Sequence, residues 1–197
     1  MKPRLGPEVA QSNRHIRKML RLAHASRNDV FYDLGCGRAQ LCIIAITEFG
    51  VKHAVGIDAH KGRASKAQRH VKRLGLSDKI EILNGNFYDL TIDEATIVYN
   101  GLVEGEEDWN YYETSLNKGT KLVTLSEPLV GAIPHAQDYP FYLMQIPLRK
   151  AGNISEWISA VLGKRSTRKE FLSEVGNDPD YWTDKRLLMR LMNKRFR

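Results

Sequence analysis

Cysteine is scarce in this chain, and long apolar runs are missing. Its 197 residues include only two cysteines, Cys36 and Cys42, too few for a disulfide scaffold or for a complete cysteine set around zinc. No stretch approaches the roughly 18 consecutive apolar residues of a membrane-spanning helix, and the first residues contain no apolar signal-peptide core. We therefore expect a cytoplasmic protein with reduced cysteines, no bound metal and no membrane insertion.

Repeats and compositionally biased tracts are also absent. With 42% hydrophobic and 27% charged residues, the composition is typical of a folded globular protein and excludes a disordered chain. The length fits one domain with an appendage. We expect that residues 1–150 form this domain and that residues 151–197 form a basic helical extension packed on or beside it.

Short segments with strand character alternate with segments of helical periodicity along most of the chain. This alternation predicts βαβ units, and hence an α/β fold with a doubly wound, mostly parallel sheet. The segment at 141–148 is expected to be an antiparallel edge strand, because Pro147 cannot donate to a central ladder. The expected strands are 29–34, 53–58, 79–83, 95–99 and 120–126, and the expected helices before residue 150 are 13–25, 40–49, 63–74 and 106–116.

The most informative motif is Asp-Leu-Gly-Cys-Gly-Arg-Ala at residues 33–39, where the first strand turns into a helix. Small residues at such a turn let a ligand approach the backbone, and the helix N-terminus offers free N–H groups. A dinucleotide fingerprint would need a third glycine where Gln40 stands, and no Gly-Lys-Ser/Thr follows for a phosphate-binding Walker loop. Two further markers follow: Asp58, 21 residues after Gly37, ends the second expected strand, and Asn-Gly-Asn-Phe-Tyr-Asp at 84–89 follows the third.

These three motifs resemble those of class I S-adenosylmethionine (SAM)-dependent methyltransferases, in which an acidic residue precedes Gly-x-Gly-x-Gly/Ala. The resemblance covers about residues 14–148. Together with Tyr-Asn-Gly-Leu at 99–102, the motifs are most similar to those of the small archaeal protein-lysine methyltransferases. That group is related to the eukaryotic mitochondrial enzymes that modify the ATP synthase c-subunit and the adenine nucleotide translocase. Two features depart from the archaeal pattern: Ala39 replaces the usual third glycine, and the extension after about Ile154 is longer.

The resemblance implies a role for individual residues. Asp33, Gly35 and Gly37 would hold the methionine end of SAM. Asp58, with Ala59 beside it, would bind the ribose, and Asn86 with Phe87 the adenine. Asn100 would face the transferring methyl group, and Glu104 would stand at the lysine entrance. S-adenosyl-L-homocysteine would be the product.

The residues after the fourth strand narrow the acceptor. No Asn-Pro-Pro-Tyr motif is present, which argues against adenine-N6 or glutamine-amide methylation. No cysteine stands there to act as the nucleophile of a cytosine-C5 enzyme. Amines, hydroxyls and small metabolites remain as acceptors.

Charge is distributed unevenly. The chain carries +7 overall, with +6 in each of residues 1–28, 60–79 and 149–197, −2 in residues 29–59 and −9 in residues 80–148. The acidic excess is concentrated just after Asn100 and is interleaved with aromatic residues, which suits a lysine ammonium. A solvated helix with carboxylates at its N-terminus explains these residues equally well. The acidic residues concerned are Glu104, Glu106, Glu107, Asp108 and Glu113.

Three functions are consistent with the sequence. The first is a protein-lysine N-methyltransferase whose substrate is a protein that presents a lysine. Its reaction would be an in-line displacement by an amine made neutral at a cost of about 4 to 5 kcal/mol at pH 7, promoted by alignment and desolvation. The second is an RNA methyltransferase whose basic N- and C-terminal segments bind phosphates, so nucleic acid stays open as a partner without being favoured. The third is a SAM-binding module without catalysis, and the oligomeric state is not predicted.

Overall fold

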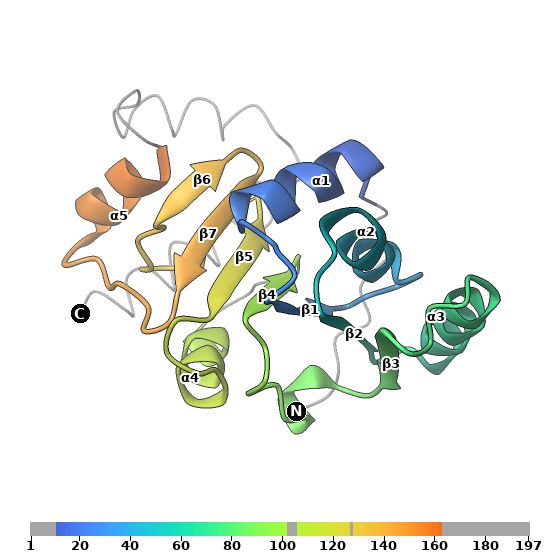
Figure 1. Cartoon of the computed structure of the whole chain (residues 1–197). Helices are drawn as coiled ribbons and strands as arrows, with labels where there is room; N and C mark the ends of the chain where they lie inside the picture. The colour runs from blue at the N-terminus through green and yellow to red at the C-terminus, as the bar shows by residue number, and fades with distance from the viewer. Residues whose placement is uncertain (1–10, 102–105, 127, 163–197) are drawn as a thin grey trace, which may run out of the picture.

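A seven-stranded sheet forms the centre of the protein. The computed structural model describes residues 11–101, 106–126 and 128–162. The strands lie in the order β3-β2-β1-β4-β5-β7-β6 (Figure 1). Strands β1 to β5 pair in parallel, β7 is antiparallel to β5, and β6 is antiparallel to β7. Their bounds are β1 Val30–Leu34, β2 His53–Asp58, β3 Ile80–Asn84, β4 Ile97–Asn100, β5 Lys121–Leu125, β6 Ala136–Asp138 and β7 Phe141–Gln145.

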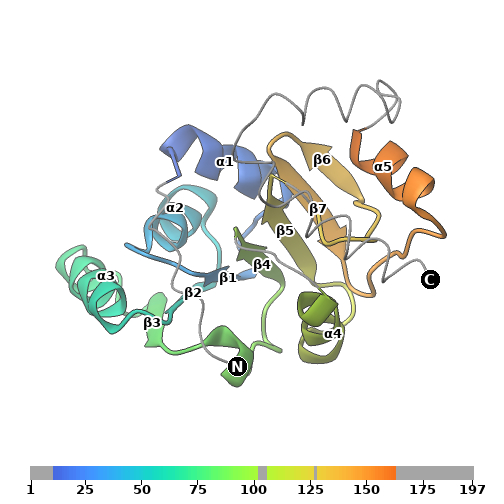
Figure 2. The same cartoon turned by 180° about the vertical axis from the view of Figure 1, so that it is seen from behind.

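Helices cover both faces of this sheet, as the opposite views in Figures 1 and 2 show. Helices α1 (Asn13–Leu22), α2 (Gln40–Phe49) and α3 (Lys61–Arg73) share one apolar core with the first face. The 3₁₀ turn η1 (Phe87–Asp89) and α4 (Glu106–Ser115) pack on the second face. Helix α5 (Ile154–Leu162) lies on this second face as well, where Trp157 packs with Tyr142 of β7.

Local sequence explains where these helices begin and end. The Ser12 hydroxyl accepts a hydrogen bond from the N–H of His15 and so caps the start of α1. At the start of α3, His60 Nδ1 accepts from the N–H groups of Gly62 and Arg63. Helix α2 ends at Gly50, whose φ of +66° is the left-handed conformation that glycine adopts without a Cβ clash. The helix boundaries therefore depend on polar side chains and one glycine.

The strand order reverses between β1 and β4. From β1 the chain adds β2 and β3 on one side, and from β4 it adds β5, β7 and β6 on the other. Ligands of open α/β sheets bind at the carboxyl ends of the strands at such a reversal. The loop after β1, the end of β2 and the end of β4 all lie at this edge. This edge is therefore the expected place of the candidate site.

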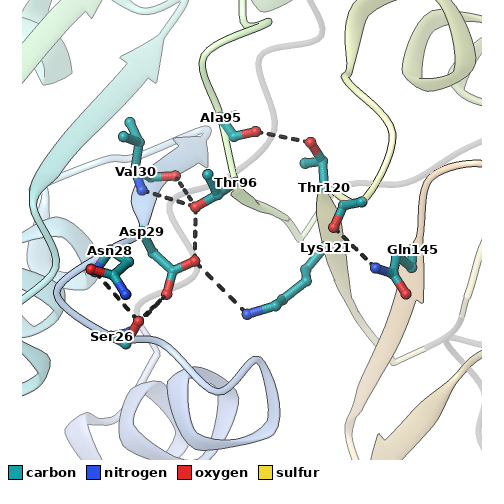
Figure 3. A network of polar contacts seen from close by, with 10 residues as sticks. Ser26, Asn28, Asp29, Val30, Ala95, Thr96, Thr120, Lys121 and Gln145 are labelled. Atoms are coloured by element: carbon teal, nitrogen blue, oxygen red, sulfur yellow. Dashed lines mark hydrogen bonds and ion pairs between the residues drawn. The ribbon is translucent and has the colours of Figure 1, made fainter.

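The opposite, amino-terminal edge is held by a polar network around Asp29 (Figure 3). One carboxylate oxygen accepts hydrogen bonds from the hydroxyl and the N–H of Ser26, and the other accepts from the Thr96 hydroxyl at 2.9 Å. Thr96 Oγ1 also accepts from the N–H of Val30, and Lys121 Nζ lies 3.8 Å from Asp29. The starts of β1, β4 and β5 are thus tied together by side chains.

The structure corrects one expectation about the sheet. Its antiparallel edge strand is β6, which the sequence did not indicate, whereas β7 lies between β5 and β6. Pro147 does not conflict with this inner position, because it lies after the end of β7. The other nine expected helices and strands are present, with ends within three residues of those expected. The expected extension at 151–197 is described only as far as α5, and the rest lies outside the described residues.

Candidate functional site

The loop after β1 has an unusual backbone. Gly35, Gly37 and Ala39 all have positive φ angles, of +91°, +53° and +62°. The N–H groups of Gly35 and Cys36 donate to the carbonyl of Ile57 in β2, at 2.8 and 3.0 Å. Left-handed geometry costs a residue with a Cβ about 1 to 2 kcal/mol, so Ala39 bears a strain that the third glycine of related motifs avoids. The loop is therefore a tight turn fastened to the neighbouring strand.

Gly56 allows this loop to lie so close to β2. A Cβ atom on Gly56 would be 2.8 Å from the Cβ atom of Cys36 and 2.9 Å from its Sγ atom. Both distances are too short for real side chains. No role was predicted for Gly56 from the sequence, and its place in the middle of a buried strand is the signal that could have indicated one.

Asp58 joins the loop to the start of α3. Its Oδ2 atom accepts from the N–H of Gly37 at 3.0 Å, and Oδ1 accepts from the N–H of His60 at 2.8 Å. The Arg63 Nε atom lies 3.6 Å from Oδ1. The Asp58 side chain, which is expected to bind the ribose, is 4% exposed. Its hydrogen bonds order the backbone both in the loop after β1 and at the start of α3. Ala59, the next residue, is half-buried.

Asp33 is the electrostatic anomaly of the site. Its side chain is 2% exposed, and its Oδ2 atom has no hydrogen-bond partner among the described residues. Burial, with a smaller contribution from the negative charge of Asp58, raises the pKa of the Asp33 carboxyl to about 7. A buried carboxylate without a partner is costly, and a cationic ligand group would relieve the cost. This atom is the clearest sign that a ligand belongs here.

The loop after β3 holds the two residues expected at the adenine. Asn86 caps η1, because its Oδ1 atom accepts from the N–H of Tyr88, and its Nδ2 atom donates to Asp89. The ring of Phe87 lies 4.3 Å from that of Tyr88 and 5.7 Å from that of Tyr111, centroid to centroid. Both expected residues are half-buried at the carboxyl edge.

Asn100 ends β4 and is fully buried, beside Leu34 in register. Its Nδ2 atom donates to the hydroxyl of Tyr112 at 2.7 Å. Burial raises the pKa of the Tyr112 hydroxyl, so it stays protonated. The structure therefore fixes Asn100 at the edge next to the glycine loop, while its role at a methyl group stays a prediction.

Helix α4 is fastened to the loop after β3, which sequence reasoning missed. The Tyr88 hydroxyl donates to Asp108, and the Tyr111 hydroxyl donates to the carbonyl of Phe87 at 2.7 Å. Further along the helix, Glu113 Oε1 accepts from the N–H of Leu148 at 2.6 Å. Asp108 is 1% exposed, so two of the five acidic residues expected at a lysine entrance serve the packing of α4. Glu104 lies outside the described residues.

Neither a metal cluster nor a disulfide is found in the part of the chain that the structure describes. No group of three histidine, cysteine or carboxylate side chains comes together there. Cys36 and Cys42 are free and buried, and burial raises the pKa of both thiols. Among the described residues, no helix has the length and apolar character needed to cross a membrane.

Known proteins share both sequence and fold with this chain, although no family model matches it. A protein-lysine N-methyltransferase from Saccharolobus islandicus (strain REY15A) is 33% identical over 120 residues, which are 60% of this chain and 74% of that protein. An RNA methyltransferase from Salinibacter ruber, solved with S-adenosyl-L-homocysteine, superposes with a TM-score of 0.68 at 27% identity. The match covers 75% of this chain and 100% of that one.

More distant structures share the fold alone. A geranyl diphosphate C-methyltransferase from Streptomyces coelicolor A3(2) has a TM-score of 0.51 at 21% identity over 56% of this chain and 44% of its own. The Saccharolobus match is stronger evidence of kinship than these structures, because it combines 33% identity with coverage of 74% of the relative's length. Taken with the loop after β1 and the strand order, that match shows that the chain belongs to the class I SAM-dependent methyltransferases.

Proposed function

We propose that the protein transfers a methyl group from SAM to the amine of a lysine side chain in a protein. The similarity to the Saccharolobus islandicus protein-lysine N-methyltransferase carries this proposal. When bound, SAM supplies an electrophilic methyl group on a positively charged sulfur. What remains for the chain's own residues is to hold the cofactor, to align the amine and to exclude water.

The residues at the carboxyl edge fit this cofactor. Asp33 offers a buried, unpartnered oxygen to the cationic amino group of the methionine end. Gly35 and Gly37 keep that end of the edge free of side chains. Asp58, next to Ala59, would accept from the ribose hydroxyls, while Asn86 and Phe87 would contact the adenine. In this arrangement the charge that is costly in the free protein becomes an attraction for the ligand.

The acceptor would meet the methyl group near Asn100. A lysine amine must lose its proton before it can attack, at a cost of about 4 to 5 kcal/mol at pH 7. Burial next to a positive sulfonium favours the neutral amine, since desolvation and like charge both lower the pKa of an ammonium. We propose Asn100 as the residue nearest the transfer and Glu104 as a residue of the lysine entrance, with no dedicated strong base.

Labelled methyl transfer tests the proposal. The protein is incubated with methyl-labelled SAM and a cell lysate, and the product is treated with protease or with ribonuclease. We expect protease-sensitive label that acid hydrolysis releases as methyl-lysine. Ribonuclease-sensitive label would overturn the lysine assignment, and cofactor binding without any label would indicate a module without catalysis.

A substitution at Asp58 tests the cofactor site separately. Asp58→Ala removes the expected ribose ligand, so binding of S-adenosyl-L-homocysteine in calorimetry should be lost. Because Asp58 also orders the N–H groups of Gly37 and His60, the variant is compared in thermal unfolding with Asp29→Ala, a buried acid at the opposite edge. Binding of S-adenosyl-L-homocysteine that persists in Asp58→Ala, or that is lost to the same extent in Asp29→Ala, would contradict this placement of the cofactor.

RNA methylation is the second candidate function. It is favoured by the Salinibacter ruber RNA methyltransferase, whose whole chain is covered by the match. The ribonuclease arm of the labelling experiment decides between the two. We further propose a cytoplasmic protein in which residues 1–150 form the methyltransferase domain and residues 151–197 an extension of it.

A further inference from the structure

The helices on the two faces of the sheet carry opposite charges. Helices α1 and α3 contain four and six lysine or arginine residues, and the only acidic residue of α1, α2 and α3 is Glu48. Helices α4 and α5 together contain five acidic residues and no lysine or arginine. Among the described helices the excess of positive charge therefore lies in one layer, in α1 and α3. The candidate cofactor site at the strand ends does not account for it.

Helix α3 presents its cations in a continuous stripe. Its buried side is formed by Ala64, Ala67 and Val71, spaced three and four residues apart. Two residues after each buried position stands a cation, in the order Lys66, Arg69 and Arg73. A step of two residues is a rotation of about 200° around an α-helix. All three cations are exposed. The stripe consequently faces directly away from the core.

Pairing distinguishes this stripe from the other cations of the layer. Arg17 in α1 is paired with Glu48 at 2.6 Å, and Lys18 with Asp138 at 2.7 Å. Within the described ranges, no ion pair involves Lys66, Arg69 or Arg73. Intramolecular pairing thus neutralises part of the charge of α1, whereas the stripe on α3 keeps its full positive charge toward solvent.

We propose that the α3 stripe of Lys66, Arg69 and Arg73 is a docking surface for the phosphodiester backbone of a nucleic acid. Rows of exposed lysine and arginine bind phosphates without reading base sequence. A membrane surface fits less well, because amphipathic helices bind bilayers by inserting an apolar face. The apolar face of α3 is already buried against the sheet.

The position of α3 separates this surface from the methyl acceptor. The helix lies at the end of the sheet beside the edge strand β3, away from α4 in both views (Figures 1 and 2). Helices α3 and α4 also pack on opposite faces. A nucleic acid bound along α3 therefore leaves the opposite face, with α4 and α5, open, so that docking and methylation can involve two different molecules.

Fluorescence anisotropy with the full chain tests the proposal. The probes are a short DNA duplex and a short RNA duplex of random sequence, titrated over a series of salt concentrations, and phosphatidylserine vesicles are titrated as the alternative ligand. The variant Lys66→Gln/Arg69→Gln/Arg73→Gln removes the stripe while glutamine preserves helix propensity. The matched control, Lys118→Gln/Arg149→Gln/Lys150→Gln, removes the same charge from exposed positions elsewhere. Thermal unfolding and binding of S-adenosyl-L-homocysteine verify that both variants fold.

The slope of log K against log salt gives the decisive readout. Each lost phosphate contact lowers the magnitude of this slope by about 0.9. The slope of the α3 variant should therefore be about 2 to 3 smaller in magnitude, and the variant should bind at least about 10-fold more weakly at low salt. The control should keep most of the wild-type slope. The duplex that binds more tightly would show whether the surface prefers the backbone of RNA or that of DNA. Equal losses in both variants, an unchanged slope in the α3 variant, or binding to phosphatidylserine vesicles but to neither duplex would overturn the proposal.

Discussion

Replacing Asp33 by asparagine should stabilise the cofactor-free protein relative to the wild type, by an amount that increases as the pH rises. The pKa of this buried carboxyl is about 7 in the folded protein, against about 3.9 in an unfolded chain. The folded state therefore holds a proton that the unfolded state releases, and the free energy of unfolding falls between about pH 4 and pH 7. At 1.36 kcal/mol per pKa unit the total loss is about 4 kcal/mol.

The pH dependence, more than the absolute stability, tests this reasoning. From about pH 5 to pH 8 the wild-type protein should lose about 2.6 kcal/mol relative to Asp33→Asn. Urea unfolding followed by circular dichroism at both pH values measures this difference. Asp29→Asn is the matched control, because Asp29 is also buried but its two oxygens have partners, and this substitution should destabilise the protein. If the stabilities of the wild type and Asp33→Asn stay parallel from pH 5 to pH 8, the carboxyl is not buried without a partner.

Three further substitutions probe the packing around the two edges of the sheet. Gly56→Ala should lower the free energy of unfolding by about 1 to 3 kcal/mol, because the new Cβ meets Cys36; an unchanged urea midpoint would show that the loop has room. Tyr112→Phe removes the hydroxyl that accepts from Asn100 and should cost about 1 kcal/mol in the same assay, whereas full stability would mean that this bond contributes nothing. Thr96→Val should cost about 1 to 3 kcal/mol with unchanged calorimetric affinity for S-adenosyl-L-homocysteine, since Thr96 lies at the opposite edge; weaker binding would contradict that separation.

Local sequence patterns were sufficient to predict the alternating fold. Helix α2 was expected at 40–49 and strand β2 at 53–58, and the structure places both at these residues. Helix α2 combines continuous apolar character with a glycine stop at Gly50, and β2 is buried along almost its whole length, so that local propensity and burial agree. The resemblance to class I methyltransferases implied that the glycine loop and Asp58 share one site. The structure brings them together because neighbouring parallel strands end at one edge.

Long-range pairing could not be predicted in this way. Strand β6 has only three residues, all exposed, so it has no apolar pattern and exists because β7 offers it a partner. The contact of Tyr88 with Asp108 joins residues 20 apart in sequence, and nothing local distinguishes that carboxylate from a solvated one. The unpartnered oxygen of Asp33 is likewise a consequence of packing, which the motif alone does not reveal.

The network around Asp29 has a consequence for how this protein can change. It ties the starts of β1, β4 and β5 together through side chains, while the loops of the candidate site leave the opposite ends of the strands. Strand register is therefore specified at a distance from the loops of the candidate site. Sequence variation in those loops can accumulate without shifting the strands beneath them, so new acceptor preferences can evolve on an unaltered frame.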